Sequence, residues 1–208
     1  MRILLTLLLA VCLLQAQAQV PKDALLKRKA PESFQVLFTT TKGYFILEAY
    51  RRWSPLGVDR LYQLVLSGFY NNNMIYRVEP NYVVQFGISD KFELNFFWDQ
   101  KKITDEPVLY QHKKGVVAFA RDVANSRATQ LFINMVDNPT LDTTVRSGVK
   151  GFSPIGKIIK GMEVVAKFNS KYGRRIVPIQ DSIYLYGNAY LEENFPGLDY
   201  IIAAQIIR

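Results

Sequence analysis

Short runs of alternating apolar and polar residues recur along this chain, which is the pattern of half-buried β-strands. Residues 34–40 and 44–50 form two such runs on either side of Gly43, as in a hairpin. Comparable runs continue to the end of the chain. The expected strands are residues 34–40, 44–50, 74–78, 82–87, 115–120, 130–135, 153–159 and 199–207.

Helical spacing occurs in two segments. The first follows Ser54, a candidate N-cap, and has Pro55 at its first helical position. The second is residues 161–168, whereas residues 89–114 are expected to be an irregular loop that Phe96, with its two aromatic neighbours, holds against the body. Because isolated helices stand among many short strands, a closed β-barrel with two capping helices fits better than a doubly wound sheet.

The first residues have the pattern of a secretory signal peptide. An apolar run follows Arg2, and Ala16-Gln17-Ala18 is a small-x-small cleavage pattern. The run is shorter than the ~20 residues that span a bilayer, although an uncleaved anchor or a buried helix would also be apolar. We predict a signal peptide at residues 1–18, a tail at 19–33 and one domain at 34–208. The protein is expected to be secreted or periplasmic, without stable membrane insertion after cleavage.

Length and charge narrow the class of protein. The chain has 208 residues, of which 49% are hydrophobic and 21% charged, enough for one domain with a substantial core. Its net charge of +8 becomes +7 once Arg2 leaves with the signal. The basic residues lie in scattered pairs such as Arg51-Arg52 and Lys113-Lys114 rather than on one element. This favours a solvated surface, and we expect a monomer that binds no nucleic acid; unspecific attraction to anionic surfaces stays open.

The reactive side chains exclude several kinds of chemistry. Cys12 is the only cysteine and leaves with the predicted signal, so the mature chain has no disulfide, thiolate ligand or thiol nucleophile. His112 is the only histidine, and no nucleophile elbow accompanies it. The carboxyl groups of Asp105 and Glu106 are adjacent in sequence and would point apart. What remains is a chemistry that needs no nucleophile and no titrating group.

Two longer segments resemble the cyclophilins. Residues 76–87 read Tyr-Arg-Val-Glu-Pro-Asn-Tyr-Val-Val-Gln-Phe-Gly, similar to the family's active-site stretch F-H-R-x-x-P-x-F-M-x-Q-G-G. Residues 115–120, Gly-Val-Val-Ala-Phe-Ala, are followed after nine residues by 130–133, Gln-Leu-Phe-Ile, and these resemble the G-x-L-S-M-A and S-Q-F-F-I strands. The order and the spacing of these segments also match. The resemblance covers about residues 34–168 and resumes in the last strand.

The resemblance implies a mainly β fold, a closed eight-stranded antiparallel barrel capped by two helices, and peptidyl-prolyl cis-trans isomerase activity without a cofactor or a metal. Rotation about a peptide bond has a barrier of ~18–20 kcal/mol, whereas the two isomers before proline differ by ~1 kcal/mol. A cation aimed at the prolyl nitrogen stabilises the twisted state, in which that nitrogen regains its lone pair. By resemblance Arg77 is this cation, and Gln85 holds its guanidinium.

The same resemblance implies a groove for proline-containing segments of client proteins. Main-chain groups of Ala120 and Arg121 would flank the substrate, and Gln130 would lie at the groove floor. Phe132 could equally belong to the core, because strand residues alternate between faces. The implied substrate-binding residues are Tyr82, Val83, Ala120, Arg121, Gln130, Phe132, Leu141 and Phe152.

Some positions depart from the family pattern. Thr140 falls where many eukaryotic members have tryptophan and Phe152 where they have histidine, which bears on cyclosporin binding more than on isomerisation. Val83 stands where methionine is usual. With Thr140, this relaxed pocket keeps a second hypothesis open: a barrel that binds proline peptides or unfolded chains without isomerising them.

Two segments look unusual for the family. Residues 142–151 form a longer loop, which would reshape one wall of the groove. Residues 174–198 look like an insertion whose aromatic side chains pack on the barrel, either as a surface cover or as a partner-docking patch. A structural envelope protein that uses this insertion as an interface is the remotest alternative.

Overall fold

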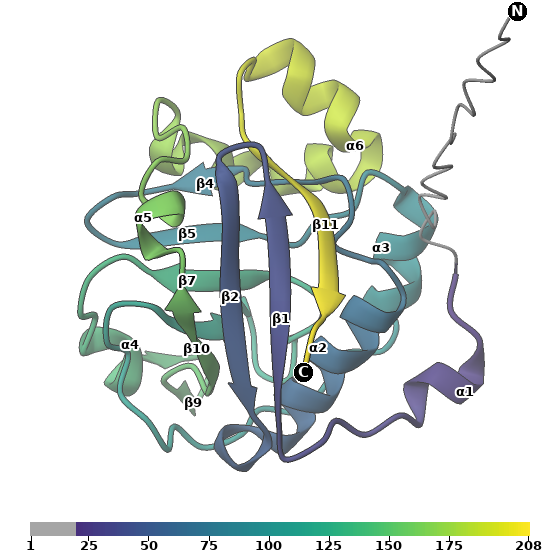
Figure 1. Ribbon diagram of the computed structural model, residues 1–208, viewed down its shortest axis with the longest axis vertical. Coiled ribbons are helices and arrows are strands. Elements are labelled where there is room, and N and C mark those ends of the chain that lie inside the picture. The colour runs from purple at the N-terminus through teal and green to yellow at the C-terminus, as the bar shows by residue number, and fades with distance from the viewer. Residues whose placement is uncertain (1–19) are drawn as a thin grey trace, which may run out of the picture.

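An antiparallel sheet of nine strands forms the body of the structure, a computed structural model that describes residues 20–208 (Figure 1). Its order is β3-β11-β1-β2-β10-β6-β7-β5-β4, and β8 and β9 form a separate hairpin. The mainly β architecture agrees with the sequence pattern. The strands are β1 (Ser33–Thr40), β2 (Gly43–Tyr50), β3 (Asn73–Met74), β4 (Arg77–Val78), β5 (Val83–Phe86), β6 (Val116–Phe119), β7 (Leu131–Asn134), β8 (Val145–Arg146), β9 (Val149–Lys150), β10 (Pro154–Lys160) and β11 (Tyr200–Ile206).

The sheet is curled so strongly that its two edge strands, β3 and β4, are neighbours along the chain. β3 pairs with β11 at one edge and β4 pairs with β5 at the other, yet only Ile75 and Tyr76 separate β3 from β4. The strand expected at residues 74–78 is therefore divided, and the eight expected strands become nine. The division occurs where the chain changes pairing partner, and the two linking side chains enter different apolar clusters.

The main core joins the sheet to α2. Alternate residues of β1 are buried, and they include Val36 and Phe38. Phe38 stacks on Phe45 of β2 with ring centroids 4.8 Å apart, and it meets Tyr70 and Phe86 edge to face. Because burial of one such ring contributes about 1.5–3 kcal/mol, this aromatic group is a main source of stability.

The helices outnumber the two that were expected. α2 matches the first expected helix, but the second, at residues 161–168, is reduced to the four residues of α5. Neither α3 nor α6 was predicted. The helices are α1 (Asp23–Leu26), α2 (Pro55–Leu66), α3 (Phe92–Asp99), α4 (Thr140–Thr143), α5 (Met162–Val165) and α6 (Gln180–Asn194), with the 3-10 helices η1 (Arg51–Trp53) and η2 (Gly173–Ile179).

α3 lies within residues 89–114, where an irregular loop was expected. Its helical period is obscured in the sequence because Phe92 and Phe96 are apolar yet exposed. Leu94 and Trp98 are buried and fix the helix to the body. Of the three aromatic residues expected to hold this segment, Trp98 is buried and Phe97 packs against the main core, whereas Phe96 is 51% exposed and does not.

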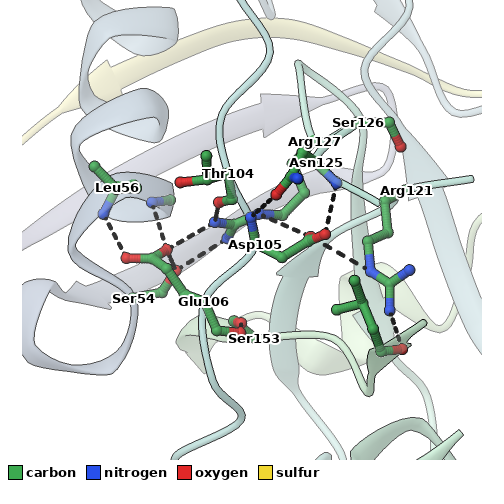
Figure 2. A network of polar contacts seen from close by, with 12 residues as sticks. Ser54, Leu56, Thr104, Asp105, Glu106, Arg121, Asn125, Ser126, Arg127 and Ser153 are labelled. Carbon is green, nitrogen blue, oxygen red and sulfur yellow. Dashed lines mark hydrogen bonds and ion pairs between the residues drawn. The ribbon is translucent and has the colours of Figure 1, made fainter. Parts of the chain in front are cut away.

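The start of α2 is held by a carboxylate from a distant loop (Figure 2). Glu106 accepts hydrogen bonds from the main-chain N–H groups of Leu56 at 2.8 Å and Gly57 at 3.1 Å, two of the amides that a helix start leaves unpaired. Ser54 is the N-cap residue of α2 and Pro55 its first residue, as predicted, but the hydroxyl of Ser54 donates to the same carboxylate and makes no cap bond to the helix. Arg127 also donates to Glu106, at 2.9 Å, and balances its charge.

The predicted N-terminal tail is attached to the body. The side chain of Gln63 donates to the main-chain oxygens of Leu26 at 3.0 Å and Arg28 at 2.9 Å. The carboxylate of Asp59 accepts from the N–H of Ala30 at 2.8 Å. The predicted signal peptide lies outside the described residues. Within residues 20–208, no helix has the length and the apolar character to span a membrane.

Residues 172–198, which we name the C-terminal cover, lie over β4 at one end of the sheet (Figure 1). η2 contacts β4, and α6 contacts both η2 and α3. Apolar side chains of the cover join Met74, Tyr76 and Ile88 in a cluster separate from the main core. The packing expected for residues 174–198 is therefore observed, and it is largely helical.

Candidate active site

Strands β4 and β5 place Arg77 and Gln85 side by side. The two residues are partners in the antiparallel register, so their side chains lie on the same face of the sheet. Nη1 of Arg77 donates to Oε1 of Gln85 at 2.9 Å. The structure thus brings together the two residues that the sequence predicted as the catalytic pair.

Arg77 has a second polar partner, Glu79, that sequence reasoning missed. Oε1 of Glu79 lies 2.6 Å from both Nε and Nη2 of Arg77. The guanidinium also lies over the ring of Tyr82, 5.4 Å from its centroid. Residues two apart in an extended chain share a face, and this signal could have revealed the contact. The side chain of Arg77 stays 15% exposed, so it is supported on several sides without being closed off.

Gln130 lies behind this pair, next to the first residue of β7. Its Oε1 accepts from Nε2 of Gln85 at 2.9 Å and from the hydroxyl of Tyr76 at 2.5 Å. A guanidinium can only donate, so Gln85 presents its oxygen to Arg77 and its amino group to Gln130. Both ends of the Gln85 amide are engaged, which fixes its orientation. Gln130 was predicted at the groove floor, whereas Tyr76 was not predicted as part of the site.

A small apolar cluster adjoins the arginine through Tyr82. At its centre the ring of Phe132 meets that of Phe152 edge to face, with centroids 5.6 Å apart. Phe132 belongs to this cluster and not to the main core, which decides between its two predicted placements. The cluster gathers Ala118 with the six apolar residues predicted to bind substrate: Tyr82, Val83, Ala120, Phe132, Leu141 and Phe152.

Ala120 and Arg121 were predicted to offer main-chain groups to the substrate. The N–H of Ala120 already donates to the carbonyl oxygen of Gln130 at 2.9 Å, so only the carbonyl group of Ala120 can serve a substrate. The side chain of Arg121 is buried, and its guanidinium lies over the ring of Phe152, 4.9 Å from the centroid. Arg121 therefore supports the apolar cluster from behind, a task that the sequence did not reveal.

The far wall of the cluster is an ordered hairpin. Residues 142–151, expected as a long loop, contain the end of α4 and the β8–β9 pair. Asp105 lies 3.5 Å from Nε of Arg121 and forms an ion pair with it (Figure 2). Arg121 donates to three main-chain oxygens of this segment, those of Arg146 at 3.1 Å, Val149 at 2.9 Å and Gly151 at 2.8 Å.

His112 packs behind the same wall. Its ring stacks on Phe132 with centroids 5.6 Å apart. Nδ1 accepts from the side-chain amide of Asn134 at 3.0 Å, so the ring proton is on Nε2, which donates to the main-chain oxygen of Phe152 at 2.8 Å. Burial lowers the pKa of His112 below its ordinary 6.5, although the bond to Phe152 and the charge of Asp142 act in the opposite direction. The neutral imidazole is thus a structural support of the site.

The carboxylates near the site form ion pairs with arginine side chains. Asp105 and Glu106 point apart, as expected, toward Arg121 and toward α2 respectively (Figure 2). Glu79 lies against Arg77. Among residues 20–208 there is no group of three or more His, Cys, Asp or Glu side chains that could hold a metal ion.

Residues 35–184 match the protein family Cyclophilin type peptidyl-prolyl cis-trans isomerase/CLD. The match covers more than half of the chain and contains every predicted site residue. The chain belongs to the cyclophilin-type peptidyl-prolyl cis-trans isomerases. Its predicted fold class and its predicted activity, isomerisation of the peptide bond before proline, are thereby confirmed.

Bacterial isomerases are among the relatives of this cyclophilin. It is 34% identical over 160 residues to peptidyl-prolyl cis-trans isomerase A of Dickeya dadantii, and the aligned region covers 73% of this chain and 80% of the relative. It is 31% identical over 172 residues to a peptidyl-prolyl cis-trans isomerase of Acinetobacter baylyi, over 77% of this chain and 87% of the relative. The fold resembles that of a Cryptosporidium parvum cyclophilin, with a TM-score of 0.59 and 16% identity over 85% of this chain and 98% of that one.

Proposed function

We propose that Arg77 is the catalytic cation of this isomerase and that the neighbouring apolar cluster holds the proline ring. The observation that carries the proposal is the fixed guanidinium, bound by Gln85 at 2.9 Å and lying 5.4 Å from the ring of Tyr82. Because Tyr82 also belongs to the apolar cluster, a bound proline and a donor for its nitrogen would be adjacent.

The chemistry follows from the structure of the amide. Rotation removes the partial double bond at a cost of ~18–20 kcal/mol. The prolyl nitrogen then has a lone pair that the planar amide lacks. An N–H of Arg77 donated to this lone pair stabilises the twisted state more than the ground state, which is the condition for catalysis. A guanidinium stays charged at all ordinary pH values, so this step needs no titrating group.

The proposed substrates are extended, proline-containing segments of client proteins. A structure of the Cryptosporidium parvum cyclophilin was determined in the presence of the dipeptide Ala-Pro, which supports a proline-containing substrate here. Phe132→Ala should weaken binding of a proline peptide about tenfold, whereas Phe92→Ala, at an exposed position of α3, should leave it unchanged. Calorimetric titration measures both, and unaltered binding in Phe132→Ala would contradict the pocket.

A binding module without catalysis is the second candidate, motivated by the small side chain of Val83 and by Thr140. Both hypotheses predict peptide binding, but only the isomerase accelerates cis-to-trans conversion. Measuring peptide affinity and conversion rate on the same sample separates them. Tight binding with a conversion rate equal to the spontaneous one would favour the binding module.

We further propose that the enzyme acts outside the cytoplasm. The charged start, the apolar run and the Ala16-Gln17-Ala18 pattern support export. Expression of the full chain in a bacterial host should yield an exported protein whose mass corresponds to a start at Gln19. Ala18→Glu should block cleavage. Retention of the full-length wild-type chain in the cytoplasm would contradict this location.

A further inference from the structure

The C-terminal cover reaches the strand that carries Arg77. Tyr76, the residue before the arginine, has its side chain in the cover's apolar cluster and is 1% exposed. Ile176 of η2 and Ile183 of α6 are buried in the same cluster. The packing of the cover and the conformation of the chain at Arg77 are therefore physically linked.

Polar contacts fix the position of the cover on the barrel. The main-chain N–H of Asn188 donates to the carboxylate of Asp90 at 2.8 Å, and its side chain donates to the main-chain oxygen of Asn72 at 2.9 Å. α6 is interrupted at Gly187, where φ is +63°, and a Cβ at this position would lie 2.4 Å from the main-chain oxygen of Asp90. This close approach requires glycine. The cover is thus seated at the start of β3 and beside α3.

The hydroxyl of Tyr76 connects this cover to the site. It donates to Oε1 of Gln130 at 2.5 Å, and Gln130 accepts from Gln85, which in turn accepts from Arg77. Burial raises the pKa of Tyr76 far above its ordinary 10, which keeps the hydroxyl protonated. Three hydrogen bonds in series therefore lead from Tyr76, whose ring packs against the cover, to the guanidinium.

We propose that Tyr76 is a positioning residue through which the C-terminal cover sets the orientation of Arg77. The inference rests on the proposed role of Arg77 as the catalytic cation. Without the hydroxyl, the oxygen of Gln130 keeps one donor instead of two, and the amide of Gln85 gains freedom to turn. Because transition-state stabilisation depends on a donor held in place, the loss should appear in turnover rather than in peptide binding.

The test is Tyr76→Phe, which removes only the hydroxyl and leaves the ring in the cluster. The expected result is a fall of about fivefold in kcat, measured by NMR exchange at saturating proline peptide, with the affinity for the peptide unchanged. Tyr190→Phe is the matched control, because its ring packs on the same cluster and its hydroxyl makes no hydrogen bond among the described residues. This control should keep the wild-type kcat.

A double-mutant cycle tests whether Tyr76 acts on Arg77 through Gln130. If Tyr76 acts through Gln130, then Gln130→Ala should lower kcat and Tyr76→Phe should lower it no further in that background. Additive losses, or a wild-type kcat in Tyr76→Phe, would overturn the inference. Arg77→Ala is measured alongside: if it too has the wild-type rate, the proposed function itself fails, whereas loss in Arg77→Ala alone refutes only the role of Tyr76.

Discussion

The guanidinium of Arg77 is held by its neighbours and still has donors to spare. It has five N–H groups; one on Nη1 is taken by Gln85, and Glu79 lies 2.6 Å from Nε and Nη2. Among the described residues, two N–H groups, one on each terminal nitrogen, therefore remain for a substrate. The two partners differ in kind, because Gln85 orients the guanidinium without charge whereas Glu79 adds a negative charge beside it.

Glu79→Ala should lower kcat/KM for a proline peptide about fivefold. The guanidinium loses one of its two polar supports, and an arginine side chain that is not held regains rotamer freedom worth up to ~2 kcal/mol. Glu79→Gln keeps an acceptor oxygen and should stay within about twofold of the wild type. A rate increase in both variants, measured in the same peptide assay, would show instead that the carboxylate weakens the cation.

At this scale the sequence predicted the residues of the motif but not their supports. Arg77 and Gln85 lie at motif spacing, and the antiparallel register makes them neighbours. The contacts of Tyr76 and Arg121 depend on segments distant in the sequence, the C-terminal cover and the β8–β9 hairpin. No local pattern carries that information.

Among the secondary-structure elements, one loop serves both α2 and the groove wall (Figure 2). Glu106 accepts from the first amides of α2, while Asp105 lies beside Arg121, which holds the hairpin. Arg127 is 2% exposed and approaches both carboxylates. The loop thus joins the helix that covers the core to the wall of the proposed proline pocket.

Glu106→Ala should reduce the free energy of unfolding by about 3 kcal/mol, because it removes the cap of α2 and leaves the charge of Arg127 buried with a weaker partner. Denaturant unfolding measures the change. Glu192→Ala, at an exposed position of α6, is the control and should alter stability by less than about 0.5 kcal/mol. Equal stability of the two variants would contradict this account of the loop.

The errors at the level of elements have physical causes. α3 was missed because apolar residues occur on its exposed side as well as its buried side. The single strand expected at residues 74–78 was divided because the chain exchanges one partner strand for another there. The side chain of Ser54 does not cap α2 because Glu106, which is distant in sequence, occupies that position. Each outcome depends on tertiary contacts that override local preference.

At the scale of the whole molecule, residues 20–208 combine three apolar clusters with different tasks. The main core stabilises the curled sheet, the second cluster seats the C-terminal cover, and the third forms the wall of the proposed proline pocket. The mainly β class could be predicted because the strands are short, alternating and interrupted by clear turns, and the family because two motifs, at residues 76–87 and 115–133, keep its order and spacing. The separation of the clusters could not, because apolar residues of all three look alike in the sequence.

The burial of His112 against the apolar cluster should make the stability of the protein depend on pH. Its folded-state pKa lies below that of the unfolded chain, so the unfolded state binds the proton more readily. The resulting stability is present above about pH 6.5 and is lost as the pH falls toward the folded pKa. Denaturant unfolding between pH 7.5 and pH 5 should show this decline. His112→Gln should have a flatter profile in that range, and an identical profile would contradict the role of the neutral imidazole.

The central claim is that a fixed arginine catalyses rotation of the bond before proline, and the cis-to-trans conversion rate of a proline peptide tests it most directly. Arg77→Ala should lose about a hundredfold in kcat/KM while keeping its thermal stability and peptide affinity. Arg77→Lys should recover little, since an ammonium lacks the planar fork that Gln85 and Glu79 hold. A folded Arg77→Ala protein with the wild-type rate would contradict the claim.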